Sequence, residues 1–250
     1  MKPEPVIQIR GLTKSFGPIE VLKGIDLDVP PGKCAVVMGG SGSGKSVLIK
    51  TIVGLLKADK GTINVLGERV DLLAGDELDK LRLSMGFLFQ SGALFDSMTV
   101  SENLMFFLER HLHLPPAEAA DRILQTLEWV GLPEKLHDYP AALSGGQKKR
   151  IALARSIIME PKILLYDEPT TGLDPVSVRM VAHLIVRLQA ERGITSIAIT
   201  HDLLCAEIIA DEVHFLQDGR FIASGSLEDI SRLDHPSIVT FFGNETIHPV

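Results

Sequence analysis

A glycine-rich loop between an apolar strand and an apolar helix constrains the fold more than any other feature. The loop spans residues 39–46 and has the pattern G-x-x-x-x-G-K-[ST]. Residues 36–38 before it have the composition of a short buried strand, and residues 47–56 after it repeat apolar side chains at helical spacing. Glycines let backbone N–H groups close on phosphate oxygens, and a helix N-terminus adds a positive dipole end. The sequence therefore predicts a phosphate-binding loop in an α/β nucleotide fold.

Specific contacts to the nucleotide follow from this pattern. We expect Lys45 to reach the β- and γ-phosphates, and the Ser46 hydroxyl to ligate Mg²⁺. ATP and Mg²⁺ are the predicted cofactors. A flexible Gly/Ser turn is the alternative interpretation, but the strand before the loop and the helix after it disfavour a chance match. The predicted phosphate-binding set is Gly39, Gly40, Ser41, Gly42, Ser43, Gly44, Lys45, Ser46 and Val47.

A second apolar strand, residues 163–166, ends in two carboxylates, Asp167 and Glu168. An acidic side chain at the C-terminal edge of a parallel strand projects into the ligand crevice of an α/β sheet. Asp167 is therefore predicted to help hold Mg²⁺ through water, and Glu168 to act as general base on an attacking water. Taken alone, the segment also fits a core strand running into a polar turn. The phosphate loop upstream favours the catalytic interpretation.

A third motif, LSGGQ at residues 143–147, lies between these two and is called the signature below. Ser144 and Gln147 fit a capping box that opens a helix over residues 146–159. Gly145 and Gly146 would lower the stability of its first turn, yet they allow the backbone to approach an anion closely. The three motifs in this order resemble those of ATP-binding cassette (ABC) ATPases, and the resemblance covers nearly the whole chain.

The resemblance implies a head-to-tail dimer in which two copies enclose two ATP molecules. The signature of one subunit would close on the γ-phosphate that the phosphate loop of the other subunit holds. Three cations follow the signature directly, and we interpret them as a solvated helix face. They are Lys148, Lys149 and Arg150.

Two further polar positions carry over from the family because each lies at a strand end. Gln90 closes the strand 86–89 and resembles the glutamine that senses Mg²⁺ and the attacking water. His201 follows the strand 196–200 and resembles the switch histidine that contacts the γ-phosphate. A single glutamine at a strand end is otherwise just a polar residue where the strand stops, so the assignment of Gln90 depends on its position.

An aromatic and an acidic residue complete the set that the resemblance implies. Phe16 lies where the family places an aromatic, more often tyrosine, that stacks on adenine; a core phenylalanine at a strand end is the alternative. Asp174 and Pro175 fit the N-cap and first position of a helix that continues to about residue 192. Capping alone accounts for Asp174, and the resemblance adds a contact across the dimer by loop 172–175.

Composition excludes several classes of protein. The net charge is −7 and no long basic block occurs, which argues against a nucleic-acid partner. The N-terminus lacks the apolar stretch of a signal peptide, and no apolar run approaches membrane-spanning length. A channel would therefore belong to another chain. Cys34 and Cys205 lie in apolar surroundings, as expected for reduced thiols.

The order of elements predicts an α/β nucleotide core with two subdomains, and the resemblance implies that residues 1–250 form one ABC ATPase domain. A RecA-like P-loop core with an antiparallel β subdomain would take residues 1–90 and 161–225, an inserted helical subdomain 91–160, and a short helical tail 226–250. The predicted strands are 6–16, 20–29, 34–38, 62–70 as a pair, 86–89, 163–166, 196–200 and the hairpin 212–224. The predicted helices are 47–56, 76–83, 101–110, 116–130, 146–159 and 175–192.

Several classes of ABC ATPase share these motifs. Translation factors carry two cassettes in one chain, and DNA-repair relatives insert coiled coils or zinc modules. This chain has one cassette and a short insert without a cysteine cluster. We therefore favour a transporter subunit at the cytoplasmic face of the inner membrane, with a second copy of itself and a membrane permease as partners. A soluble ABC ATPase that moves no solute is the alternative class.

The segment FQSGALFDSMTVSENL, residues 89–104, narrows the transporter class. It resembles the ATPases of Mla/Mce-type phospholipid transporters, which would add an Mce-domain substrate-binding subunit and a small regulatory subunit as partners. Amino-acid importers use closely similar cassettes and are the second candidate. Leu94 and Phe95 in this segment are predicted either to line a groove for a permease helix or to belong to the core of the helical subdomain.

Overall fold

Two sheets and a group of helices make up the fold in a computed structural model, which describes residues 4–243. The larger sheet has six strands in the order β10-β9-β3-β8-β7-β6. Five of them are parallel, and β10 pairs antiparallel with β9. The strands are β3 (Cys34–Met38), β6 (Met85–Leu88), β7 (Ile163–Asp167), β8 (Thr195–Ile199), β9 (Glu212–Gln217) and β10 (Arg220–Gly225).

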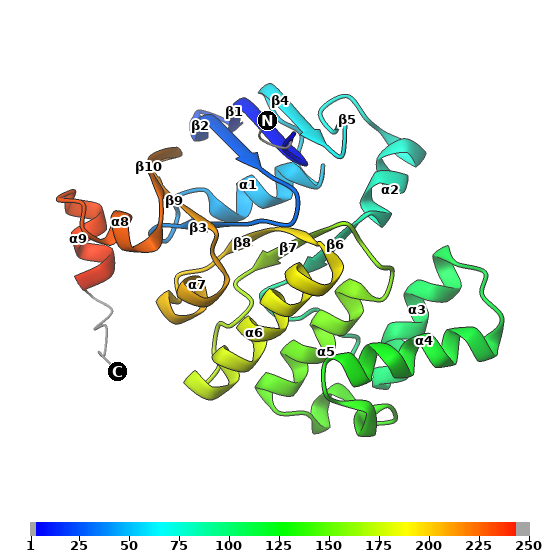
Figure 1. Cartoon of the computed structure of the whole chain (residues 1–250). Coiled ribbons are helices and arrows are strands. Elements are labelled where there is room, and N and C mark those ends of the chain that lie inside the picture. Colours follow the sequence, from blue (N-terminus) through cyan, green and yellow to red (C-terminus); the bar gives the residue numbers. More distant parts are fainter. Residues whose placement is uncertain (1–3, 244–250) are drawn as a thin grey trace.

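The smaller sheet is antiparallel, with the order β2-β1-β4-β5. It lies beyond α1 (Lys45–Ile52), on the opposite side of the large sheet from most of the helices (Figure 1). Its strands are β1 (Ile7–Phe16), β2 (Ile19–Val29), β4 (Lys60–Val65) and β5 (Glu68–Arg69).

The remaining helices occupy the other face and the edges. α3, α4 and α5 form a block that leaves the large sheet after β6 and returns to it at β7 (Figure 1). No helix within residues 4–243 is long and apolar enough to cross a membrane. The helices are α2 (Gly75–Leu83), α3 (Val100–His111), α4 (Pro116–Trp129), α5 (Gly145–Ile157), α6 (Pro175–Arg192), α7 (Leu203–Ile209), α8 (Leu227–Ser231) and α9 (Pro236–Gly243), with short 3₁₀ turns at Pro133–Lys135 and Pro140–Ala142.

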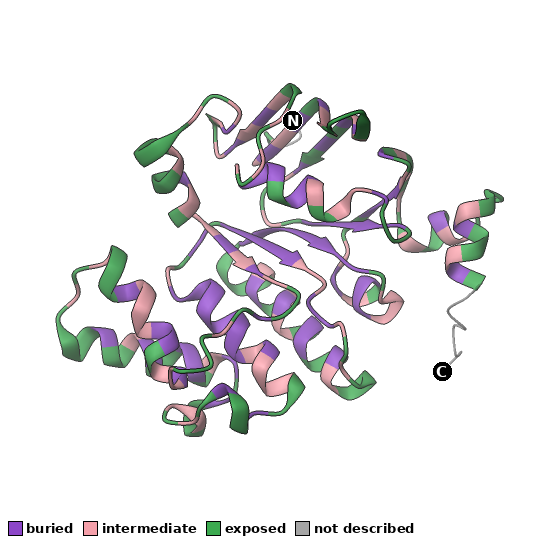
Figure 2. Cartoon of the chain, turned by 180° about the vertical axis from the view of Figure 1, so that it is seen from behind, coloured by how far each residue is buried: buried purple, intermediate pink, exposed green. Residues whose placement is uncertain are grey.

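The large sheet separates two apolar cores. Val37 of β3 packs with α1 and the smaller sheet, whereas its neighbour Val36 packs with α5, α6 and α7. Both faces of the parallel strands are therefore covered, which explains their continuous apolar sequences (Figure 2). Cys34 and Cys205 are buried and free, as predicted, and burial raises the pKa of both thiols.

The predicted α/β class with an antiparallel sheet and a helical block is confirmed, with differences at some boundaries. The helix predicted over 47–56 spans Lys45–Ile52 instead, and the chain turns at Gly54, whose φ is +70°. α7 had no specific prediction, since its seven residues are too few to show periodicity. The tail predicted over 226–250 contains α8 and α9, and residues 244–250 lie outside the described part of the chain.

Gly86 lets α5 pack closely against β6. A Cβ atom added at this buried glycine would lie 2.2 Å from the Ser156 carbonyl oxygen and 2.4 Å from a methyl carbon of Leu164. Gly86→Ala should therefore lower the free energy of unfolding by about 1–3 kcal/mol, the usual cost of overpacking a core. Urea unfolding would measure the loss. The matched control is Gly243→Ala, where an added Cβ meets no atom of residues 4–243 within 4 Å. Equal unfolding midpoints for the two variants would contradict the prediction.

Candidate nucleotide-binding and hydrolysis site

A cavity of about 680 Å³ opens at the C-terminal edge of the large sheet. The edge collects the ends of β3, β6, β7 and β8, because these strands are parallel. The cavity is lined by every residue of the predicted phosphate-binding set, and by Gln90, Asp167, Glu168 and His201. Three further lining residues, Val21, Ile199 and Phe241, were not predicted from the sequence. Phe241 belongs to α9, and no local pattern in the sequence could have placed it beside the phosphate loop.

The phosphate loop has the shape of an anion cradle. Its backbone is left-handed at Gly39, Gly42 and Gly44, with φ of +144°, +76° and +109°. A Cβ atom at Gly39 would lie 2.1 Å from the Leu216 carbonyl oxygen, whereas one at Gly40 or Gly42 would meet nothing within 4 Å in the described part of the chain. The glycines thus combine close packing behind the loop with open space in front of it.

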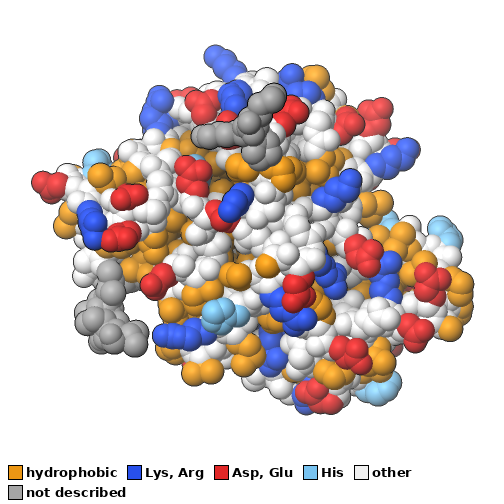
Figure 3. Space-filling view, viewed as in Figure 1, with side chains coloured by type: hydrophobic (Ala, Val, Ile, Leu, Met, Phe, Trp, Pro, Cys, Tyr) orange, Lys and Arg blue, Asp and Glu red, His pale blue; other side chains and the backbone are white. Residues whose placement is uncertain are grey.

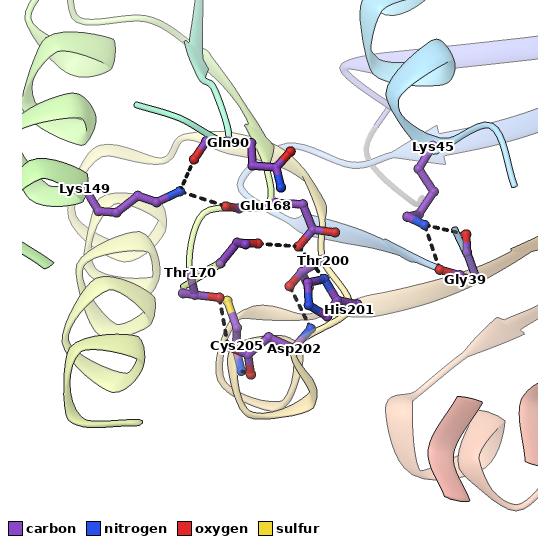
Figure 4. A network of polar contacts seen from close by, with 12 residues as sticks. Gly39, Lys45, Gln90, Lys149, Glu168, Thr170, Thr200, His201, Asp202 and Cys205 are labelled. Atoms are coloured by element: carbon purple, nitrogen blue, oxygen red, sulfur yellow. Dashed lines mark hydrogen bonds and ion pairs between the residues drawn. The ribbon is translucent and has the colours of Figure 1, made fainter. Parts of the chain in front are cut away.

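Polar groups in the loop have spare capacity for a phosphate. The Lys45 ammonium donates to the carbonyl oxygens of Gly39 at 2.7 Å and Gly40 at 2.8 Å (Figure 4). Burial lowers the pKa of Lys45, although Glu168 and Asp167 act in the opposite direction. The Ser43 hydroxyl is buried, and none of the described residues forms a hydrogen bond with it. These donors and the open cradle fit a polyphosphate.

Glu168 is held in an uncommon backbone conformation at the opposite wall of the cavity. Its φ is +54°, and its N–H donates to the Ile199 carbonyl oxygen at 2.9 Å. One carboxylate oxygen accepts from the Thr171 hydroxyl at 3.1 Å and lies 2.9 Å from His201 Nδ1 (Figure 4). A left-handed backbone at a residue other than glycine costs of order 1 kcal/mol or more and persists only where surrounding contacts hold it. The contacts above hold both the backbone and the carboxylate of Glu168. Beside it, burial and the charge of Glu168 raise the pKa of Asp167.

The interpretation of residues 148–150 as a solvated face is wrong for Lys149. Its side chain is 5% exposed, and its ammonium donates to the carbonyl oxygens of Gln90 at 2.5 Å and Glu168 at 3.0 Å (Figure 4). Arg150 is half-buried and donates to the Val130 carbonyl oxygen at 3.1 Å. These cations satisfy carbonyl groups of neighbouring loops that a sequence pattern does not reveal.

The signature lies at the start of α5 and does not line the cavity of its own chain. The capping box is confirmed: the Ser144 hydroxyl accepts from the Gln147 N–H, and the Gln147 side chain accepts from the Ser144 N–H. A Cβ atom at Gly146 would lie 2.9 Å from the hydroxyl of Ser177, so the first turns of α5 and α6 are neighbours. Asp174 caps α6 by accepting from two backbone N–H groups and from Ser177.

The predictions for Phe16 and for the pair Leu94 and Phe95 have different outcomes. Phe16 is 46% exposed at the end of β1, with the Lys14 ammonium 5.3 Å from its ring, so the alternative of a core phenylalanine is wrong. It does not line the cavity, and its stacking on adenine stays a prediction. Leu94 packs into the apolar cores, whereas Phe95 is exposed and contacts Phe106.

Similarity to known proteins agrees with this geometry. The family model described as "ABC transporter" matches residues 22–171. The chain is 35% identical to the probable ribonucleotide transport ATP-binding protein mkl of Mycobacterium leprae, covering 98% of this chain and 70% of that one. It is 37% identical to the intermembrane phospholipid transport ATP-binding protein MlaF of Haemophilus influenzae, covering 98% and 93%. It is 38% identical to the arginine transport ATP-binding protein ArgV of Corynebacterium glutamicum, covering 92% and 93%.

A solved structure shows the same architecture. It is a dimeric post-hydrolysis state of the ATP-binding cassette MJ0796 bound to ADP and Pi, with a TM-score of 0.81 and 31% identity. The similarity covers 88% of this chain and 98% of that one. With the phosphate cradle and the paired carboxylates at one cavity, the match over more than half of the residues shows that this chain belongs to the ABC transporter family as an ATP-binding ATPase subunit.

Proposed function

We propose that two copies of this chain hydrolyse ATP at a shared interface and drive a separate membrane permease. The observation that carries the proposal is the cavity at which the phosphate loop, Gln90, Asp167, Glu168 and His201 meet. Lys45 would bind the β- and γ-phosphates, Glu168 would accept a proton from the attacking water, and His201 would contact the γ-phosphate. The solved dimer of a similar cassette with ADP and Pi supports this arrangement.

Mg²⁺ fits the donors at this cavity. The side chains of Ser46, Gln90 and Asp167 all line it and offer a hydroxyl, an amide and a carboxylate oxygen. Hard oxygen donors of this kind, together with phosphate oxygens, are what Mg²⁺ takes in proteins. When bound, the ion would neutralise charge on the transferred phosphoryl group.

The signature completes the site in trans. Within one chain, residues 144–147 lie away from the phosphate loop, at neighbouring helix N-termini whose donors favour an anion. In a head-to-tail dimer, Ser144 to Gln147 would contact the γ-phosphate held by the partner, with Asp174 and its loop beside it. Binding of ATP would favour the closed dimer, and loss of the γ-phosphate would remove that preference.

A separate cavity of about 430 Å³ between α2, β6, α3 and α5 is the proposed docking site of a permease helix. Its lining includes Phe87, Phe89 and Phe107, together with Arg110 and Arg155. The rings of Phe87 and Phe89 contact each other, with centroids 4.2 Å apart and planes tilted by 34°. An apolar helix face would fill the aromatic part, as in other helix-in-groove complexes. Neither Leu94 nor Phe95 lines this cavity. We therefore place the proposed permease groove at the three phenylalanines and not at the two residues predicted from the sequence.

The groove predicts a selective loss of permease binding. Phe89→Ser removes one aromatic wall, and a buried aromatic at an interface is worth about 2 kcal/mol or more, or roughly 30-fold in affinity. Recovery of the permease with the tagged chain should fall while ATP binding persists. The control is Leu72→Ser, which changes a side chain that is 72% exposed on another part of the molecule. Equal recovery with both variants would contradict the assignment of the groove.

Phospholipid is the proposed substrate, with the chain bound peripherally at the cytoplasmic face of the inner membrane. The similarity to MlaF over 98% of the chain and the segment 89–104 support it. An Mce-domain subunit and a small regulatory subunit would complete such a transporter. The comparable identity to ArgV keeps an amino-acid importer as the second candidate. On the face seen in Figure 3, acidic and basic side chains are interspersed, unlike the basic stripe of a nucleic-acid site.

Purification from native membranes separates these candidates. The tagged chain would be isolated after gentle solubilisation, and its partners and lipids identified by mass spectrometry. A polytopic permease with an Mce-domain subunit and phospholipid supports the proposal. A permease with a soluble amino-acid-binding protein supports the importer, and recovery without any membrane protein contradicts a transporter role.

A further inference from the structure

Lys149 connects two loops of the hydrolysis site to the signature helix. Lysine is almost never fully buried unless its charge is paired or its donors are satisfied. Here the ammonium contacts the carbonyl oxygens of Gln90 and Glu168, which lie 59 and 19 residues away in the chain. These loops follow β6 and β7 and carry the residues assigned above to Mg²⁺ and to the attacking water (Figure 4). Lys149 therefore holds both of these loops from outside the phosphate cavity.

The backbone of Glu168 explains why such a contact matters. Its left-handed conformation is held from one side by the hydrogen bond of its N–H to Ile199 and from the other by Lys149 at its carbonyl oxygen. The direction of the carboxylate depends on this conformation. Burial lowers the pKa of Lys149, and the negative charges of Glu168 and Asp167 favour its charged form. In its charged form the ammonium makes both hydrogen bonds stronger than a neutral amine would.

α5 also holds the loop after Gln90 at a second point. The Arg155 guanidinium donates to the carbonyl oxygens of Ala93 at 2.5 Å and Gly92 at 2.9 Å. Lys149 and Arg155 therefore fix residues 90–93 to α5 through three carbonyl groups. Of these two side chains, Lys149 is the one that also donates to Glu168, so it joins the two loops.

We propose that Lys149 is a positioning residue that sets the geometry of Gln90 and Glu168 in its own subunit. The signature on the same helix, two residues earlier in the chain, acts on the ATP held by the partner. The first turns of α5 would thus connect the ATP held by the partner subunit to Glu168 in the subunit that carries Lys149. This inference rests on the head-to-tail dimer and on the role of Glu168 proposed above.

Lys149→Met tests the positioning role in the full-length protein. Methionine keeps much of the apolar length and removes both hydrogen bonds. Because a misplaced catalytic group can cost about 100-fold, kcat should fall roughly 10- to 100-fold. The KM for ATP should stay within about twofold, since Lys149 does not line the ATP cavity. The matched control is Lys148→Met; Lys148 is half-buried and has no side-chain hydrogen bond or ion pair among residues 4–243.

Mixed dimers separate positioning from a general effect on the helix. One subunit carries Glu168→Gln, so that only the other subunit's Glu168 hydrolyses ATP. Two different affinity tags isolate the heterodimer. Lys149→Met in the subunit with the intact Glu168 should lower turnover roughly 10- to 100-fold. The same change in the Glu168→Gln subunit, whose signature serves the live site, should leave turnover within about twofold.

The outcomes are distinct. A kcat of Lys149→Met within about twofold of the parent, or a loss on the Glu168→Gln side of the mixed dimer, overturns the inference. Loss of ATP-dependent dimerisation when Lys149→Met is combined with Glu168→Gln would show a structural role and also overturn it. A Glu168→Gln homodimer that still hydrolyses ATP refutes the assignment of Glu168 itself.

Discussion

Glu168→Gln is expected to abolish most ATP turnover while leaving an ATP-bound dimer that persists. The amide has the shape of the carboxylate but cannot accept a proton from water, and loss of a general base costs about 10²- to 10⁴-fold in rate. The phosphate loop and the signature are untouched, so ATP still bridges the two subunits. Size-exclusion chromatography with ATP would show the dimer, and phosphate release would show the loss of turnover.

The matched control is Glu118→Gln, an exposed glutamate on α4 in the helical block. It should turn over ATP like the parent and show no trapped dimer. Near-normal turnover by Glu168→Gln would contradict the assignment of the general base. The strained backbone of Glu168 and its contacts with Thr171 and His201 would then need a structural explanation.

Mixing two inactive variants is expected to restore activity. Lys45→Ala removes the phosphate contact from one subunit, and Ser144→Arg blocks the signature of the other. A heterodimer joins the intact phosphate loop of the second variant to the intact signature of the first. Random mixing makes about half of the dimers mixed, so up to roughly a quarter of the sites should work. Steady-state hydrolysis at varied mixing ratios would measure the recovery.

The control replaces the first variant with the double variant Lys45→Ala/Ser144→Arg. Its mixtures with Ser144→Arg contain no site with both parts intact, so they should stay inactive. Recovery confined to the first mixture supports the signature acting in trans. Mixtures that never exceed either single variant would contradict it.

Local motifs account for the part of the site that the sequence predicts well. The phosphate loop, the acidic end of β7 and the capping box at Ser144 each depend on a few adjacent residues and on strand or helix geometry. The parallel sheet then brings strand ends together, so Gln90 and His201 reach the same cavity.

Sequence patterns could not predict the contacts between segments that are distant in the chain. Lys149 looks like part of a surface cation run, and it is buried only because α5 packs against two loops with available carbonyl groups. Phe241 reaches the cavity because α9 folds back beside β9, where its ring meets Phe215. Leu94 packs against the core, while the cavity that we propose as the permease groove is lined by aromatics of β6, of the residue after it and of α3. Each outcome depends on tertiary packing rather than on local composition.

The most direct test of the central claim is transport by the complex purified with its own permease. The complex would be reconstituted into vesicles with fluorescent phospholipid, and movement of the label followed after adding Mg·ATP. The account predicts ATP-dependent phospholipid movement that is lost in a complex carrying Glu168→Gln. ATP-driven uptake of an amino acid by the same vesicles, with no movement of phospholipid, would contradict it.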